Sequence, residues 1–197
     1  MSGPYRLAWA SVRKCPPPDR CWFSLDAAMS IPLPIQCERV LVRPFVTDTD
    51  SDSMLAVYGD PEVMRFIPGG ALSDIAAVRS VLDVYTRAQQ DQGLSSWALV
   101  EREGGRLIGD VGFGIFEPTG DIELGYTLAR EFWGRGYALE AASACLATAS
   151  IHLSASRIVA VVDEANAPSL RVAERLGMRK VDAIEAYGRP HVLFASA

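Results

Sequence analysis

The sequence predicts an α+β (α/β) domain with a mixed, mostly antiparallel central sheet of about six or seven strands and helices on both faces. Between residues 96 and 128, three apolar runs are joined by short links, which favour antiparallel hairpins. An apolar helical run at 139–150 then leads to Ile158–Val162, a β-branched run typical of a central strand buried on both faces. A strand that is reached through a helical crossover is expected to be parallel, which makes the sheet mixed.

The bulk composition, 49% hydrophobic and 22% charged over 197 residues, is that of a soluble globular chain with one sizeable core. A formal net charge of -5 argues against nucleic acid as the main partner. No apolar run reaches the roughly 18 residues of a membrane span, so we expect no membrane partner and a cytoplasmic location. The two histidines and four cysteines include no pair at ligand spacing, so no metal site is expected.

The first residues differ in character from the rest of the chain. Three consecutive prolines, Pro16–Pro18, cannot continue a helix or a central strand. This piece also lacks the apolar stretch of a signal peptide. We therefore expect residues 1–30 to be an appended, flexible segment and residues 31–197 to be the domain, with Met29 as an alternative start.

The domain is expected to begin with a strand and two helices. The apolar run at 40–45 is a strand that Pro44 ends, and the run at 47–58 is a helix. A second helix, amphipathic, ends at Gln92–Gly93, because glycine is favoured just after the last helical turn. The candidate caps are Thr47, Asp48 or Asp50 for the first helix and Ser73 for the second.

The meander strands are expected at 96–100, 107–116 and 122–128. Three glycines inside the middle strand, Gly109, Gly112 and Gly114, are unusual for a strand interior. They indicate a bulge or the close approach of another backbone.

The second half continues with the crossover helix at 139–150 and the strand at 158–162. Asn166 then caps a helix that has Pro168 in its first turn, and Gly177 follows its last turn. Two final strands are expected at 178–184 and 191–196.

The segment Trp133–Ala138 joins the last meander strand to the crossover helix and contains Gly134 and Gly136. Glycine has no Cβ, so an anion can approach the backbone closely, and the following helix adds the positive end of its dipole. A phosphate is the natural ligand of such a turn. Taken alone, however, a Gly-x-Gly sequence before a helix is more often simply a tight turn.

The order of these motifs resembles the GNAT superfamily of acyl-CoA-dependent N-acyltransferases, and especially its branch that acetylates ribosomal-protein N-termini. The resemblance covers roughly Glu38 to the C-terminus. The superfamily's phosphate turn is Q/R-x-x-G-x-G/A, in which Trp133 takes the first place, a departure that this branch commonly shows. The motifs are Glu123-Leu124-Gly125-Tyr126-Thr127-Leu128, Phe132–Ala138, Asn166-x-x-Ser169 running on to Glu174–Met178, and Asp60–Met64 with Pro68-Gly69.

The resemblance implies acetyl-CoA as cosubstrate and no metal. It also implies that the sheet splays between its fourth and fifth strands, those at 122–128 and 158–162, and that the pantetheine pairs with the strand backbone in that gap. The phosphate turn would hold the pyrophosphate. The residues expected to bind the cofactor are Tyr126, Thr127, Leu128, Trp133, Gly134, Arg135, Gly136, Tyr137, Ala138, Asn166 and Ser169.

The expected reaction is direct attack of a neutral primary amine on the thioester. Glu123 is the first choice for the base, because a carboxylate beside an apolar cleft has its pKa raised into a useful range. Its alternative is a solvated acid at the edge of the sheet. Ser169 or Tyr187 could protonate the leaving thiolate, and Ser169 could instead only cap its helix turn.

The acceptor stays open between a protein N-terminus and a small amine. A different class of function is an acyl-CoA-binding regulatory module without turnover, which an intact phosphate turn without a working base would produce. We expect a monomer or a homodimer in either case.

Overall fold

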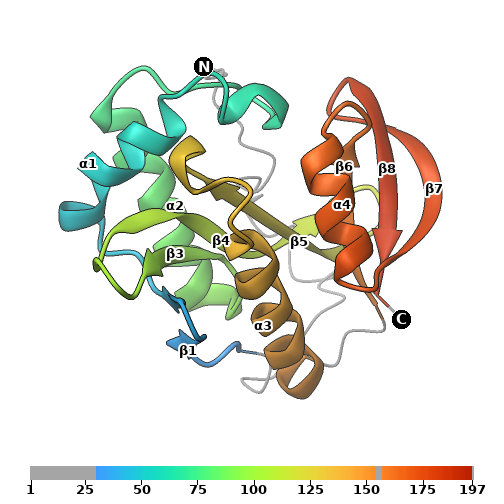
Figure 1. The fold of residues 1–197 in the computed structure, drawn as a ribbon, viewed down its shortest axis with the longest axis horizontal. Helices are drawn as coiled ribbons and strands as arrows, with labels where there is room; N and C mark the ends of the chain where they lie inside the picture. Colours follow the sequence, from blue (N-terminus) through green and yellow to red (C-terminus); the bar gives the residue numbers. More distant parts are fainter. Residues whose placement is uncertain (1–29, 154–156, 197) are drawn as a thin grey trace, which may run out of the picture.

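The computed structural model describes residues 30–153 and 157–196, which form a single mixed sheet covered by helices (Figure 1). Nearly all of the segment expected at 1–30, including Met29, lies outside the described residues. The strands are β1 (Ile35–Gln36), β2 (Val40–Arg43), β3 (Ser96–Glu101), β4 (Leu107–Phe116), β5 (Asp121–Leu128), β6 (Ile158–Asp163), β7 (Arg179–Ala186) and β8 (Arg189–Ala195). The helices are α1 (Thr47–Tyr58), α2 (Ile75–Gln92), α3 (Tyr137–His152) and α4 (Ala167–Arg175), with short 3-10 turns η2 (Met64–Phe66) and η3 (Arg130–Phe132).

The sheet order within the described residues is β1-β2-β3-β4-β5-β6-β8-β7, and every neighbouring pair is antiparallel except β5 and β6. The predicted mixed, mostly antiparallel sheet is therefore confirmed. The described sheet has eight strands, slightly more than the six or seven expected. The extra strand is β1, whose two residues are too few to show any periodicity in the sequence.

The helices cover both faces of the sheet, as predicted. On one face α3 and α4 pack over a core that contains Trp97, Phe113 and Cys145. On the other face α1 and α2 enclose a second core that contains Met54 and Leu82. Cys145 has no exposed surface and behaves as a small apolar residue of α3.

Two of the predicted helix caps are wrong. The side chain that caps α2 is Asp74, whose carboxylate accepts from the Ala77 N–H at 2.9 Å, while Ser73 donates to Asp74. No side chain caps α1, which starts after Val46. Asp50 instead pairs with Arg43 at 2.7 Å, because it is buried at 4% exposure and requires a cationic partner.

The glycines of β4 permit close contact between backbones, as predicted. A Cβ added at Gly109 would lie 1.9 Å from the Thr127 carbonyl oxygen, and one at Gly112 would lie 2.0 Å from that of Ser95. The pairing of β3 with β4 also shifts register between Leu99 and Val100. Because Gly109 pairs with Leu128, its close contact and the register shift lie at the level of the end of β5.

The parallel strands β5 and β6 stay together for only two residue pairs, Ile122 with Ile158 and Glu123 with Val159. Beyond Glu123, β5 pairs on its other side with β4 as far as Leu128, while β6 pairs with β8. The sheet therefore splays where the resemblance implied. In the described part of the chain no strand pairs with residues 125–128 on the β6 side, so this edge of β5 faces a gap.

Candidate active site

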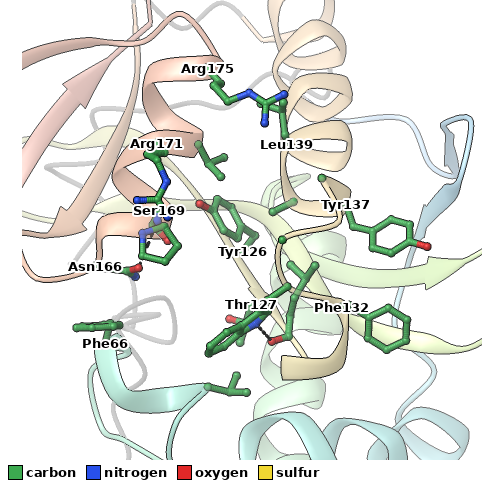
Figure 2. A pocket seen from close by; sticks show the side chains of 18 of the residues that line it. Phe66, Tyr126, Thr127, Phe132, Tyr137, Leu139, Asn166, Ser169, Arg171 and Arg175 are labelled. Atoms are coloured by element: carbon green, nitrogen blue, oxygen red, sulfur yellow. Dashed lines mark hydrogen bonds between the residues drawn. The ribbon is translucent and has the colours of Figure 1, made fainter.

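The gap between β5 and β6 holds a cleft of about 380 Å³ (Figure 2). A smaller chamber of about 80 Å³ continues it inward to Glu123, and both share Tyr126, Asn166 and Ser169 as walls. Outward, an open hollow extends from Gly134 and Gly136 across the start of α3. The three spaces are neighbours that share lining residues, and together they are called the channel, with Gly134 and Gly136 at its outer end and Glu123 at its inner end.

The turn before α3 is built on two left-handed glycines. Gly134 has φ 73° and Gly136 has φ 83°, values that residues with a Cβ seldom adopt. Gly136 is the N-cap of α3, and no side chain bonds to the N–H groups of the first turn. Those donors lie on the wall of the cleft at the positive end of a helix, which is the arrangement that binds an anion.

Trp133 ties this turn to the end of β5. Its indole Nε1 donates to the Leu128 carbonyl oxygen at 2.7 Å, and its ring is 48% exposed on the wall of the cleft. The bond occupies a carbonyl of the unpaired edge and sets the angle between strand and turn. Trp133 thus contributes structure as well as lining.

Glu123 lies at the inner end of the channel and is only 5% exposed. Its Oε2 accepts a hydrogen bond from the Tyr187 hydroxyl at 3.0 Å. Burial raises the pKa of Glu123 to about 7, and the bond from Tyr187 opposes part of that rise. The carboxyl group is therefore able to take up or release a proton near neutral pH.

Tyr187 reaches Glu123 from a tight turn. Tyr187 and Gly188 form the two-residue turn of the β7–β8 hairpin, where the sequence suggested a longer loop. Tyr187 has φ 52°, a left-handed conformation that costs a residue with a Cβ roughly 1–2 kcal/mol. The ring is held edge-on against Phe116 and His191. Burial and the nearby Glu123 raise the pKa of Tyr187, so its hydroxyl stays protonated.

Asn166 and Ser169 begin α4 on the opposite wall of the cleft (Figure 2). The Asn166 side chain accepts from the Ser169 N–H at 3.3 Å and caps the helix, as predicted. Burial raises the pKa of Tyr126, and a hydrogen bond with the Ser169 side chain offsets part of this rise. The structure thus places two sets of polar groups in one region: Glu123 hydrogen-bonded to Tyr187, and the Ser169 hydroxyl near Tyr126.

The side chains of three other residues that were predicted to bind the cofactor contact protein groups instead. The Tyr137 ring points away from the cleft in Figure 2, and its hydroxyl donates to Glu101 at 2.8 Å. The Arg135 guanidinium lies over the Phe132 ring at 5.6 Å. Thr127 lies beside the buried carboxyl of Asp110. For Tyr137 and Arg135, the backbone is the part placed in the turn.

Several lining residues were not found by sequence analysis. Arg171 and Arg175 project from α4 along the cleft wall in Figure 2, four residues apart on one helix face. That spacing is visible in the sequence and could have identified them. The aromatic side chain of Phe66, from η2, lines the same cleft below Asn166 in Figure 2 and follows no motif.

Arg189 connects the end of β6 with η2, beside the chamber that Glu123 lines. Its guanidinium forms an ion pair with Asp163 at 3.0 Å and donates to the Arg65 carbonyl oxygen at 3.1 Å. It also lies over the Phe66 ring, 5.6 Å from the centroid. Arg65 and Arg189 are 124 residues apart, so no local pattern could have revealed this contact.

Residues 30–153 and 157–196 contain no group of three side chains suited to hold a metal ion. Over the same residues, no helix is both long and apolar enough to cross a membrane.

Comparison with known proteins places these features in context. Residues 39–179 match the family model described as an acetyltransferase (GNAT) domain. The chain is 30% identical to the protein YkkB of Bacillus subtilis (strain 168) over 160 residues, 80% of this chain and 91% of YkkB. The structure resembles a GNAT-family acetyltransferase from Bacillus anthracis with a TM-score of 0.71 and 25% identity, covering 83% and 98% of the two chains. Mycobacterium smegmatis RimJ in complex with CoA-disulfide shares the fold at a TM-score of 0.67 and 20% identity, over 80% and 81% of the chains.

Proposed function

The chain belongs to the GNAT family of acetyltransferases, and from that premise we propose that it transfers the acetyl group of acetyl-CoA to a primary amine by direct attack. The observation that carries the proposal is Glu123. It is a buried carboxyl with a pKa of about 7 at the inner end of a channel whose outer end is an anion-binding turn. A candidate proton acceptor and a candidate phosphate site thus line neighbouring spaces that share residues.

The residues present fit the donor. The backbone N–H groups of the Gly134–Ala138 turn would hold its pyrophosphate, with Arg171 and Arg175 lining the same cleft. The open edge of Tyr126–Leu128 has backbone groups for the amide-bearing arm, in the manner of an added strand. The thioester would then lie beside Glu123 and Ser169 in the inner chamber.

In the reaction, the amine nitrogen forms a bond to the thioester carbonyl carbon, the carbon–sulfur bond breaks, and the amine loses one proton while the sulfur gains one. Glu123 takes the proton from the amine, and Tyr187 holds the carboxylate in position by its hydrogen bond. Ser169, paired with Tyr126 in the wall of the chamber, supplies the proton to the thiolate. Tyr187 therefore acts on the base and Ser169 on the leaving group.

The pKa of Glu123 bears on the acceptor. A base that titrates near 7 matches an amine whose own pKa is low. An α-amino group titrates near 7.7–8.0 and a lysine near 10.4, so neutralising the lysine costs roughly 3.4 kcal/mol more. We propose an acceptor with an α-amino group, either at a peptide N-terminus or on a small molecule.

The test is an assay of thiol release with acetyl-CoA and a panel of amines that includes peptides with free N-termini, amino acids and polyamines. We expect turnover with α-amines and little with lysine side chains. Binding of CoA without turnover on any amine would instead support a regulatory module. Failure to bind CoA would contradict the proposal altogether.

A further inference from the structure

Arg39, in the loop between β1 and β2, forms hydrogen bonds with the phosphate turn and with the first turn of α3. Its Nη1 donates to the Arg135 carbonyl oxygen at 2.9 Å, and its Nε donates to Glu140 Oε2 at 2.7 Å. The Arg39 backbone N–H donates to the other Glu140 oxygen at 2.7 Å. The guanidinium also lies over the Tyr137 ring, 4.9 Å from its centroid. One residue, almost 100 positions away in the chain, thus contacts the turn and the first turn of α3.

The bond to the Arg135 carbonyl fixes the orientation of a peptide group in the turn. A trans peptide is planar, and its C=O and N–H point in opposite directions. When Arg39 holds the Arg135 oxygen, the Gly136 N–H must point away from Arg39. Because Gly136 has no Cβ, its left-handed conformation is only one of several that it can adopt, and an outside contact such as this one favours that conformation.

Arg39 also affects the charge near the phosphate turn, through its contact with Glu140. It lies in the first turn of α3, where an acid suits the helix dipole but also faces the region that would receive a phosphate. Arg39 binds both of its carboxylate oxygens and neutralises it. Without Arg39, a negative charge would remain beside the anion site.

We propose that Arg39 is a positioning residue for the phosphates of the donor, acting by orienting the Gly136 N–H and by neutralising Glu140. This inference rests on the proposed function, since it takes the turn to be the pyrophosphate site. It adds a residue from outside the glycine turn, which does not line the main cleft but does line the open hollow beside the turn.

The test compares two donors in the full-length protein carrying Arg39→Met. Acetyl-CoA has the pyrophosphate and the nucleotide, whereas S-acetylpantetheine has neither. We expect the KM for acetyl-CoA to rise on the order of tenfold, as for the loss of a charge-assisted contact. The KM for S-acetylpantetheine and the KM for the amine should stay unchanged. Equal changes with both donors, or no change with either, would overturn the proposal.

Two further variants separate charge from general stability. Arg102→Met is the matched control, because the Arg102 side chain donates to the Cys37 carbonyl oxygen at 2.8 Å in the same loop and, within the described residues, does not bond to the turn. It should leave both donors unaffected. Adding Glu140→Gln to Arg39→Met should recover part of the affinity for acetyl-CoA. If the affinity does not recover, Arg39 does not act by neutralising Glu140.

The role of Arg39 in phosphate binding can be tested even if the protein does not transfer acetyl groups. If the wild-type protein binds CoA but acetylates no amine, the same comparison is made with the dissociation constants of CoA and pantetheine measured by calorimetry. An effect of Arg39→Met confined to CoA would then support the inference although the proposed function had failed.

Discussion

The two ends of the channel are built in different ways. The donor end is made largely by one continuous stretch, in which Trp133 bonds to Leu128 only five residues away. The acceptor end joins remote segments: Tyr187 meets Glu123 across 64 residues, and Arg189 meets Arg65 across 124. The donor end presents backbone N–H groups with fixed direction, whereas the acceptor end presents side chains that titrate or pair. If the proposed function is right, substitutions at the two ends should therefore affect cofactor binding and catalysis separately.

The largest effect is expected from Glu123→Gln, at the inner end of the channel. The amide cannot accept a proton from the amine, so we expect kcat to fall by about 10²–10⁴, the range for loss of a general base. The affinity for CoA should be unchanged, because Glu123 lies beyond the cleft that would hold the phosphates. Turnover assays and CoA titration measure the two effects.

Asp110→Asn is the control for that substitution. Asp110 is also buried, at 4% exposure, and burial raises its pKa to about 7, but its carboxyl is surrounded by protein and lies outside the channel. Its replacement should leave the pH profile of catalysis in place. If both variants lost activity alike, Glu123 would have no special role as a base.

Gly136→Ala tests the donor end. The left-handed backbone strains any residue with a Cβ by roughly 1–2 kcal/mol, and the added Cβ would lie 3.4 Å from the Arg39 guanidinium. We expect the KM for acetyl-CoA to rise about tenfold with kcat nearly unchanged. Gly120→Ala, at φ 75° in the distant β4–β5 turn, carries the same strain and should alter stability alone. Equal KM values for the two variants would contradict the role of the turn.

Tyr187→Phe tests the pair at the acceptor end. The Tyr187 hydroxyl lowers the pKa of Glu123, so its removal should raise that pKa above about 7. A base works in its deprotonated form, and the acid limb of kcat/KM against pH should therefore move to higher pH. At neutral pH we expect a loss of a few-fold to about tenfold. An acid limb that stays in place would show that Glu123 does not control it.

Arg189→Lys should have the smallest effect. Lysine keeps the charge that faces Asp163 but loses the planar group that contacts the Arg65 carbonyl oxygen and the Phe66 ring. We expect the KM for the amine to rise about threefold, because the contact is partly exposed and of modest strength. Steady-state kinetics with both substrates would show it, and a rise in the KM for acetyl-CoA instead would place Arg189 at the wrong end.

Features that depend on neighbouring residues could be predicted from the sequence. The glycines that follow α2 and α4, the Asn166 cap and the apolar run of β6 each have a local physical cause, and the structure confirms them. Even at this level two caps were wrong, since Asp74 rather than Ser73 caps α2 and Asp50 pairs with Arg43. Several polar residues compete at a helix start, and their packing decides between them.

The contacts between side chains that are remote in sequence became visible in the fold alone. Glu123 and Tyr187 were both candidates from sequence, yet nothing in the sequence shows that one bonds to the other. The contacts of Arg39 with the turn and of Arg189 with Arg65 depend on how the β1–β2 loop and the β7–β8 hairpin are placed by the sheet. The physical reason is range: backbone conformation is set within a few residues, whereas burial and ion pairing are set by segments that only folding brings together.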